Sequence, residues 1–417
     1  MHSLLLLLIL LLMKHTSQEN KVSEFEFFKS RCGNTIPIKF LTLFMFTDYN
    51  CTFEPYHVDT ETLKLFPTKC REVCAYLLID QTSDVAEKQL VTAFKNVKVL
   101  YGSLKVSKTN LTNIKFLSGV EFFECDTDSP LLFEANSELT EIGMTNFKST
   151  SCAITLNNIQ KMERLNLPNL KTTLTFFNSI PITQNFYTLF NPPLLSIDIA
   201  NKLCLTIEEI TNFVSSDVWE MHPFHNPYCN FSSSDLSKFD EKICEVQHFS
   251  LKSFDSSCKR IFGNVMIQSG DEEHVRKLEN VTWIYGRIVI NGTSLSVIDF
   301  FEHLEYVAYF KDDEYSIYII NNTGLTSAVY PNLRLVRTTN KNPRVIVFRD
   351  NNAQLSSDPA VCFNIRNSLN TTEKLIPYID GRTCEDIANV SSVIEPFVWL
   401  MVTGSFLALF VLNDYIF

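Results

Sequence analysis

Short hydrophobic stretches of three or four residues recur along the chain, separated by longer segments in which polar residues predominate. Strands this short and this far apart do not suit hairpins, but they suit a ladder of parallel strands in which each coil of the chain stacks on the previous one. The pattern therefore predicts a mainly β fold with short helices, built from coils of the β-helix or leucine-rich-repeat kind. The expected strands are Leu131 to Phe133 and Ile154 to Leu156 in the first half, and Val265 to Ile267, Ile288 to Ile290, Tyr318 to Ile320 and Val345 to Val347 in the second.

The stretch from Lys95 to Glu124 occurs twice. A gapless comparison with the stretch that starts at Glu279 pairs each residue with one 184 positions later, and nine of the pairs are identical. The same offset pairs Cys74 with Cys258, which makes the repeating unit a whole domain. The sequence therefore predicts two related modules in tandem.

Two further features fit coils with tight corners. Gly102, Gly263 and Gly286 stand next to expected strands, and each is expected to take a positive φ that a β-branched residue would not tolerate. Asn136 and Asn322 occupy corresponding places after a strand, at an offset of 186, so the repeat survives small insertions.

The composition bounds the architecture and the kind of partner. A chain of 417 residues with 45% hydrophobic residues is long enough for two sizeable cores. The net charge is -11, and Lys and Arg are scattered along the chain. This distribution lacks the basic stripe that contacts a phosphate backbone, so nucleic acid is excluded as the expected partner.

Several features indicate export. The apolar run Leu4 to Met13 is followed by a polar stretch, as in a cleaved secretory signal, with retention as a short anchor as the alternative. The twelve cysteines then predict disulfides formed in an oxidising compartment. Eight N-x-S/T sequons support export, of which Asn50, followed by Cys51, is the weakest. The expected glycosylation sites are Asn110, Asn230, Asn280, Asn291, Asn321, Asn370 and Asn389.

Three pairs of blocks carry a family resemblance. They are NVKVLYGSLKV and NVTWIYGRIVI, NLTNIKFLSGV and SLSVIDFFEHL, and the closing LCLTIEEI and VCFNIRNSL. In this order they resemble the receptor L domain of the insulin and EGF receptor ectodomains, over about residues 70 to 230 and 244 to 385. The resemblance implies right-handed, β-helix-like solenoids that are capped at their ends and that help to form a surface for polypeptide ligands.

The chain departs from those receptors in two ways. It has no extended cysteine-rich module between the L domains, and no kinase follows them. It resembles the smaller insulin/EGF-receptor-like proteins that place two L domains on a surface anchor. We therefore expect a signal peptide at 1–17, an N-terminal extension at 18–69, receptor L domain 1 at 70–230, a linker at 231–257, receptor L domain 2 at 258–385, a stalk at 386–396 and a C-terminal hydrophobic anchor at 397–412.

The C-terminal run from Phe397 to Leu412 carries no charge, and only five residues follow it. Sixteen helical residues span about 24 Å, which is short of a hydrocarbon core of about 30 Å. A cleaved GPI-attachment signal explains the terminal position and the missing basic residues, and a transmembrane helix is the equal alternative. Either anchor predicts display on the outer cell surface.

The cysteines suggest matching disulfides. Cys204 with Cys229 and Cys362 with Cys384 follow the last strand of each module, separated by 25 and 22 positions. Each would stabilise its module by about 3 kcal/mol. Cys244 with Cys258 and Cys125 with Cys152 are the other expected pairs, whereas Cys32, Cys51, Cys70 and Cys74 allow three pairings. A zinc site of Cys70, Cys74, His222 and His225 is the disfavoured alternative, because exported cysteines with available partners form disulfides.

The sequence offers no catalytic or cofactor motif. It contains no G-x-S-x-G, H-E-x-x-H or P-loop, and the acidic run Asp312 to Glu314 is typical of a solvated loop. We therefore expect a non-enzymatic protein with no cofactor and no metal. The alternatives are an anchored carbohydrate-active β-helix enzyme, which needs two carboxylates in one groove, and a structural surface glycoprotein.

An aromatic cluster is the candidate binding surface. Exposed aromatic side chains give rigid, amphipathic contact area for a protein partner, although a core strand with flanking aromatics is the plainer interpretation. Together with the resemblance, the cluster predicts a cell-surface protein that engages a polypeptide ligand, insulin-like or EGF-like, or another ectodomain, as decoy, co-receptor or adhesion partner. The cluster consists of Tyr306, Tyr309, Phe310, Tyr315 and Tyr318.

Overall fold

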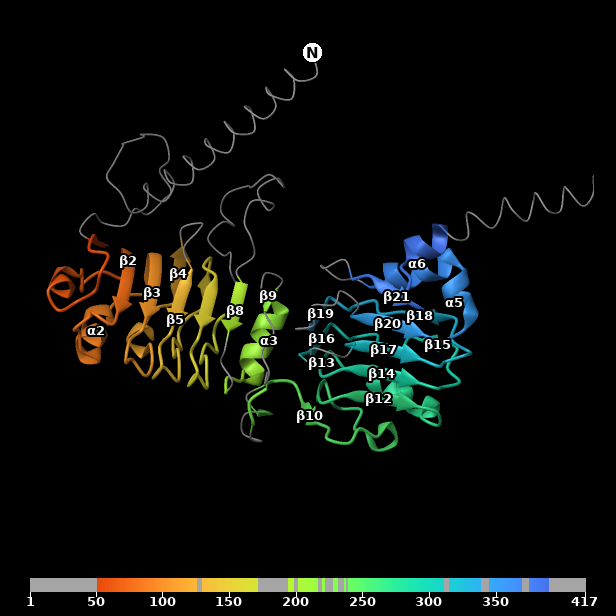
Figure 1. Ribbon diagram of the computed structural model, residues 1–417. Coiled ribbons are helices and arrows are strands. Elements are labelled where there is room, and N and C mark those ends of the chain that lie inside the picture. The colour runs from red at the N-terminus through yellow and green to blue at the C-terminus, as the bar shows by residue number, and fades with distance from the viewer. Residues whose placement is uncertain are drawn as a thin grey trace, which may run out of the picture. The chain divides into compact units, whose positions relative to one another are not determined.

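The computed structural model describes most of the chain between residues 51 and 389 (Figure 1). The described residues are 51–125, 130–171, 194–198, 202–216, 220–221, 228–231, 236–237, 239–310, 315–338, 345–369 and 375–389. They belong to two compact units, divided between Asn230 and Phe231. The expected signal peptide and anchor, Cys32, Asn50 and Asn370 lie outside the described residues.

The first unit is a sheet of parallel strands in the order β1-β2-β3-β5-β7-β8-β9, with β4 joined to β3 and β6 joined to β4. The long strand β3 serves two sides of the coil, because its first half pairs with β4 and its second half with β5. The elements are β1 (Thr52–Phe53), η2 (Thr62–Leu65), β2 (Glu72–Asp80), α2 (Glu87–Phe94), β3 (Val99–Ser107), η3 (Lys115–Leu117), β4 (Phe122–Cys125), β5 (Leu131–Glu134), β6 (Ser149–Thr150), β7 (Ile154–Asn157), β8 (Leu194–Asp198), α3 (Ile207–Ser215) and β9 (Glu220–Met221).

The second unit has two five-stranded parallel sheets, in the orders β10-β11-β13-β16-β19 and β12-β14-β17-β20-β21, and a small sheet of β15 and β18. From β11 to β20, and leaving aside β15 and β18, successive strands along the chain alternate between the two large sheets, as coils require (Figure 1). The elements are β10 (Ile243–Glu245), η6 (Leu251–Ser253), β11 (Arg260–Phe262), β12 (Val265–Gln268), η7 (Glu272–Leu278), β13 (Trp283–Tyr285), β14 (Ile288–Asn291), β15 (Val297–Ile298), β16 (Tyr306–Tyr309), β17 (Ile317–Ile320), β18 (Ser327–Ala328), β19 (Leu335–Thr338), β20 (Ile346–Arg349), α5 (Ala353–Ser357), α6 (Pro359–Ser368) and β21 (Pro377–Ile379).

The core of the second unit consists of rows of stacked aliphatic side chains. Ile288, Ile317 and Ile346 stand in register on three neighbouring strands and are fully buried. Each side chain of this kind contributes roughly 1.5–3 kcal/mol through its removal from water. Since side chains alternate between the two faces of a strand, the residues between these inward positions point outward.

Glycines allow neighbouring coils to approach closely. Gly102 lies inside β3 with φ +139°, and a Cβ there would stand 2.0 Å from the carbonyl oxygen of Ala75. Gly263 has φ +133°, as expected from the sequence. Gly286 is required for a different reason from the one expected, because a Cβ would lie 2.1 Å from the carbonyl oxygen of Gly263. Backbone contact between coils therefore excludes a side chain at these positions.

Helix α3 follows the last described coil of the first unit and is fastened to it by a buried carboxylate. Oε1 of Glu209 accepts a hydrogen bond from the backbone N of Leu167 at 2.8 Å, and Oε2 accepts one from the backbone N of Thr206 at 2.9 Å. Burial raises the pKa of Glu209, against the effect of these hydrogen bonds. A reciprocal bond from the backbone N of Glu209 to the Thr206 hydroxyl completes the capping box.

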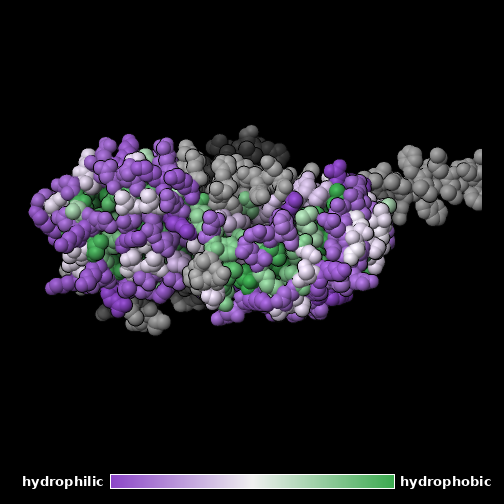
Figure 2. All heavy atoms as spheres, turned by 90° about the horizontal axis from the view of Figure 1, so that it is seen from below, coloured by the Kyte–Doolittle hydropathy of each residue, from purple (hydrophilic) through white to green (hydrophobic). Residues whose placement is uncertain are grey.

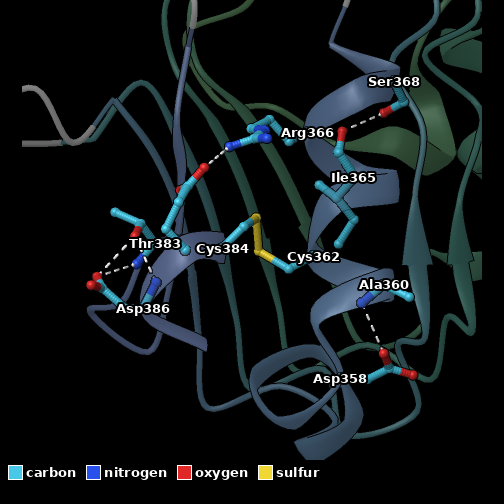
Figure 3. Close-up of a disulfide and its surroundings, with 10 residues drawn as sticks. Asp358, Ala360, Cys362, Ile365, Arg366, Ser368, Thr383, Cys384 and Asp386 are labelled. Carbon is cyan, nitrogen blue, oxygen red and sulfur yellow. Dashed lines mark hydrogen bonds and ion pairs between the residues drawn. A yellow bond between two sulfur atoms is a disulfide. The ribbon is translucent and has the colours of Figure 1, made fainter. Parts of the chain in front are cut away.

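Disulfides join the coils and the closing helices. The bonds Cys125–Cys152, Cys204–Cys229, Cys244–Cys258 and Cys362–Cys384 join the four pairs expected from the sequence, and Cys51–Cys70 is a further bond within the group left open. Figure 3 shows Cys362 on α6 bonded to Cys384. On the same helix Asp358 caps the N-terminus by accepting a hydrogen bond from the backbone N of Ala360 at 2.9 Å.

Both units begin earlier than the sequence predicts. Strand β1 lies in the expected extension 18–69 and pairs with β2, and β10 lies in the expected linker 231–257 and pairs with β11. The expected strands at 131, 154, 265, 288, 318 and 345 correspond to β5, β7, β12, β14, β17 and β20. The sequence missed β11, β13, β16 and β19, so each coil of the second unit has two long sides where one was predicted.

Candidate binding surface

A column of side chains runs across the outer face of the β12–β21 sheet. Neighbouring strands lie about 4.8 Å apart, so a column across five strands is about 19 Å long. The residues beside these positions on each strand point into the core. The column, called the outer column below, consists of Met266, Val289, Tyr318, Val347 and Tyr378, which the strand register places in line.

Large and small side chains alternate along the outer column. Met266 is 37% exposed, and the two tyrosines of the column are half-buried. Val289 and Val347, in contrast, are only 8% and 6% exposed. The ring of Tyr315 lies 5.2 Å from that of Tyr318 and enlarges the central aromatic group. The column therefore has three projecting side chains with two shallow positions between them.

The next outward row on the same sheet is mainly uncharged. It contains Gln268, Asn291, Ile320 and Arg349, again in register. The one charged member is Arg349, whose Nε lies 3.4 Å from Oδ2 of Asp350. On a chain with net charge -11, this sheet face therefore offers an apolar surface with a polar rim.

The corresponding sheet of the first unit has a different outer face. Its strands β2, β3, β5 and β7 place Leu78, Lys105, Leu132 and Thr155 in line. Nζ of Lys105 forms an ion pair with Glu134 on the neighbouring strand at 3.4 Å. The continuous apolar column is thus a property of the second unit.

The structure separates the aromatic cluster that the sequence predicts. Tyr315 and Tyr318 belong to the sheet face with the outer column, whereas Tyr306 lies on the other large sheet. Tyr309 and Phe310 are each 3% exposed, so the prediction that they are exposed is wrong. The reason is that Tyr309 ends β16, a central strand between β13 and β19, and Phe310 follows it directly.

Sequence reasoning missed four members of the outer column, namely Met266, Val289, Val347 and Tyr378. A usable signal was present, because Met266 and Val289 are the middle residues of two predicted three-residue strands. Aligning all the short strands by their inward residues would have brought the outward residues into one row. Tyr378 stands between Pro377 and Ile379 and offered no comparable hydrophobic run.

The β10–β19 sheet carries an arginine that lies over two aromatic rings. The guanidinium carbon of Arg260 lies 5.1 Å from the ring centroid of Phe239 and 5.2 Å from that of Trp283. Its Nη1 donates to the hydroxyl of Tyr285 at 3.0 Å, and its Nε donates to Oε2 of Glu241 at 2.6 Å. Two of its nitrogens thus donate to described partners, and the arginine side chain is 14% exposed.

A histidine with two carboxylates fastens the first coil of the first unit. Nδ1 of His57 lies 3.3 Å from Oδ2 of Asp59, and its Nε2 lies 3.1 Å from Oδ1 of Asp80. The hydrogen bond to Asp80 raises the pKa of His57, which burial lowers and Asp59 raises. The hydroxyl and backbone N–H of Thr82 lower the pKa of Asp80 to about 2, with a smaller contribution from His57. The two carboxylates thus favour the charged form of the His57 imidazole.

One family model matches the chain. The description is Receptor L domain, and the matched residues are 69–151 and 257–367, one stretch in each unit. The chain carries two receptor L domains. A search among curated proteins finds no match. Domains of this family bind ligands and are not catalytic, which makes a ligand-binding, receptor-type protein the general class.

The L domains and their disulfides indicate an extracellular protein, since five described disulfides require an oxidising compartment. Within the described residues, no helix has both the length and the apolar character to cross a membrane. The cysteines of the disfavoured zinc site are disulfide-bonded, and the two histidines lie outside the described residues. In the described part of the chain, no group of three or more His, Cys, Asp or Glu side chains is placed to hold a metal ion.

The sequons lie on the surface of the L domains. Each asparagine of a described sequon is exposed, as a glycan requires. Nδ2 of Asn321 donates to Oδ1 of Asn291 at 3.2 Å, so two sequons stand side by side on neighbouring coils. Occupancy remains a prediction. The exposed sequon asparagines are Asn110, Asn230, Asn280, Asn291, Asn321 and Asn389.

Figure 2 shows hydrophobic side chains gathered on the second L domain as seen from its β10 end. Val246 and Phe249, which follow β10, are partly exposed and pack against the core. The apolar surface of this domain is therefore not confined to one sheet face.

Proposed function

We propose that this protein is a non-enzymatic binding protein of the cell surface that engages a polypeptide ligand through the outer column of its second L domain. The observation that carries the proposal is the unbroken line of uncharged side chains Met266, Val289, Tyr318, Val347 and Tyr378 on a chain with net charge -11. Membership in a family of ligand-binding domains supports it.

The shape of the outer column suits a polypeptide better than a small molecule. Its length of about 19 Å exceeds that of a small ligand and matches a short element of protein secondary structure. Tyrosine is enriched among the residues that dominate protein interfaces, since its ring buries much area at low entropic cost. The central pair Tyr315 and Tyr318 is the expected hot spot.

The finer parts of the proposal follow from the sequence. The ligand is an insulin-like or EGF-like polypeptide or another ectodomain, and the protein acts as decoy, co-receptor or adhesion partner. The coils wind in the right-handed sense that the resemblance implies. The signal peptide at 1–17 and the hydrophobic run at 397–412 support display on the outer membrane face, by a GPI anchor or a transmembrane helix.

Surface plasmon resonance tests the proposal. The purified protein is passed over a panel of immobilised insulin-like and EGF-like polypeptides, and membrane ectodomains captured with the tagged protein are added to the panel. A specific interaction that Tyr318→Ala weakens at least tenfold supports the proposal. Leu132→Ala is the matched control, because Leu132 holds the equivalent outward position in the first L domain. No interaction across the panel, or equal effects of the two substitutions, overturns it.

A further inference from the structure

The second L domain holds one arginine in an arrangement that differs from its surface ion pairs. The guanidinium of Arg260 lies over the rings of Phe239 and Trp283, while Glu241 and Tyr285 accept its hydrogen bonds. Stacking on aromatic faces combined with a carboxylate partner is the way in which proteins recognise acidic groups through arginine. Here the carboxylate, of Glu241, and one of the rings, of Phe239, come from a nearby segment of the same chain.

Phe239 and Glu241 contact Arg260 through their side chains. Phe239 and Glu241 lie in neither a helix nor a strand, and β10 begins only at Ile243. Oε2 of Glu241 reaches Arg260 although 39% of the Glu241 side chain is exposed, whereas the arginine is 14% exposed. The arginine and Trp283 belong to strands of the sheet, so they form the fixed part of the arrangement and the Phe239–Glu241 segment forms the exchangeable part.

Further aromatic rings extend the fixed part along the sheet. The ring of Trp283 stacks on that of Tyr306, with centroids 4.2 Å apart and planes 23° apart. Tyr306 is half-buried, so the aromatic surface continues beyond the segment that contains Phe239. A peptide that replaced this segment would find an aromatic wall next to the arginine.

The first L domain lacks this arrangement. The equivalent residue there is Glu72, because Glu72 and Arg260 each pair with the residue two positions before the repeated tyrosine. Oε2 of Glu72 accepts the hydrogen bond of the Tyr101 hydroxyl at 3.3 Å. Tyr101 and Tyr285 are equivalent residues of the sequence repeat. The hydroxyl of Tyr101 bonds to a glutamate, whereas the hydroxyl of Tyr285 bonds to an arginine. The site is therefore specific to the second domain and favours an acidic partner.

We propose that Arg260 and Trp283 form a peptide-recognition site for an aromatic residue followed two positions later by a carboxylate, and that Phe239 and Glu241 occupy this site as a tethered competitor. A ligand segment with the same pattern displaces them. The site lies on a different sheet from the outer column, and its test needs no natural ligand, so its outcome is independent of the proposed function.

The test uses a fluorescent peptide with the sequence of residues 236–242, Leu-Ser-Lys-Phe-Asp-Glu-Lys, and the full-length protein. A short tether gives the internal segment an effective concentration in the mM range, which suppresses binding of the free peptide. Fluorescence anisotropy should therefore show at least tenfold tighter binding to the Phe239→Ala/Glu241→Ala protein than to the wild type. Adding Arg260→Gln to that variant should abolish the gain.

Controls separate recognition from general loosening of the fold. Glu385→Gln releases Arg366, which lies over the ring of Phe363 at 4.6 Å and pairs with Glu385, and this variant should bind the peptide no better than the wild type. A peptide with lysine in place of the glutamate should not bind. Glu241→Gln alone leaves the packing of Phe239 intact and should still give a gain of at least threefold.

Natively folded variants, judged by near-ultraviolet circular dichroism, decide the outcome. If Glu241→Gln and the double variant bind the peptide no tighter than the wild type, or if binding is indifferent to Arg260→Gln, the proposed site is wrong.

Discussion

Oδ1 of Asn322 accepts two hydrogen bonds from Thr293, one from its backbone N at 2.9 Å and one from its hydroxyl at 2.7 Å. The first L domain repeats this relationship between Asn136 and Thr109, at 2.9 and 2.8 Å. In both domains the asparagine Nδ2 also donates to a carbonyl oxygen of the preceding strand. All four side chains are buried, so each asparagine satisfies polar groups that the stacking of coils removes from water.

We expect Asn322→Ala to destabilise the second L domain by about 3 kcal/mol, because the substitution leaves buried donors and acceptors of the neighbouring coil without partners. Thr323→Ser, at an exposed neighbour, keeps the Asn321 sequon and should change the free energy of unfolding by less than about 0.5 kcal/mol. Urea denaturation measures both. A loss of less than 1 kcal/mol for Asn322→Ala would contradict the role given to this side chain.

The hydrogen bond between Thr293 and Asn322 decides which substitution can test glycosylation at Asn291. Thr293 completes the sequon and its hydroxyl is committed to Asn322, so Thr293→Ala would remove a buried hydrogen bond together with the sequon. Asn291→Gln removes the glycan-accepting residue and, besides it, only the exposed hydrogen bond from Asn321. Mass spectrometry of the secreted protein should then show loss of one glycan without loss of thermal stability.

Substitution of Tyr330 is expected to raise stability, in contrast to substitution of Asn322. Its side chain is fully buried, its hydroxyl has no hydrogen-bond partner, and burial raises its pKa. Tyr330→Phe keeps the ring stacked on Phe301 and removes the unpaired hydroxyl, so it should stabilise the protein by about 1 kcal/mol. Tyr285→Phe is the matched comparison and should destabilise it, since that hydroxyl accepts from Arg260. Chemical denaturation distinguishes the two, and destabilisation by Tyr330→Phe would show that the hydroxyl has a role.

Residues with a left-handed backbone conformation at the coil corners offer another way to raise stability. Ala135 follows β5 with φ +52°, a conformation that costs a residue with a Cβ about 1–2 kcal/mol. Ala135→Gly should therefore raise stability by roughly 0.5–1 kcal/mol after the entropic cost of glycine is included. Asn158, with φ +53° after β7, tolerates this conformation better, so Asn158→Gly should gain less. Thermal unfolding tests the order, and a larger gain at Asn158 would refute it.

His57 predicts how stability depends on pH. Its pKa in the folded chain is raised above 6.5, so its stabilising effect is complete below about pH 6.5 and is lost as the pH rises through the folded pKa. Asp80 has a pKa lowered to about 2, so its effect is complete above about pH 4 and is lost toward pH 2. His57→Gln should remove the alkaline loss and keep the acid loss, because Thr82 is the main cause of the low pKa of Asp80.

Urea midpoints of wild type and His57→Gln at pH 5.5, 7 and 8.5 measure this dependence. The two proteins should differ most at the lowest of these values and converge toward the highest. A difference that grew with pH would contradict a raised pKa of His57 in the folded protein.

The period of the hydrophobic pattern was enough to predict parallel coils, because inward residues such as Ile288 and Ile290 alternate with outward ones on each short strand. It was not enough to predict β13 or β16. Trp283, Ile284 and Tyr285 are all buried, so this strand shows no alternation that marks its faces.

The candidate site was harder to predict than the fold. The sequence cluster includes Tyr315 and Tyr318, whose rings lie together at the outer column. The same signal wrongly included Tyr309 and Phe310 as exposed residues, because their burial depends on strands far away in the sequence. Tyr378 becomes part of the outer column only through pairing of β20 with β21. A register between strands some 30 residues apart cannot be read from one sequence without knowing where each coil turns.

The most direct measurement of the central claim is the ratio of partner affinities between wild type and Tyr318→Ala, set beside the ratio for the equivalent Leu132→Ala in the first L domain. Both are obtained by surface plasmon resonance with the first polypeptide partner that binds. If the outer column of the second L domain is the binding surface, Tyr318→Ala weakens binding at least tenfold and Leu132→Ala less than twofold. Unchanged affinity for Tyr318→Ala, in a protein with native stability, would contradict the claim.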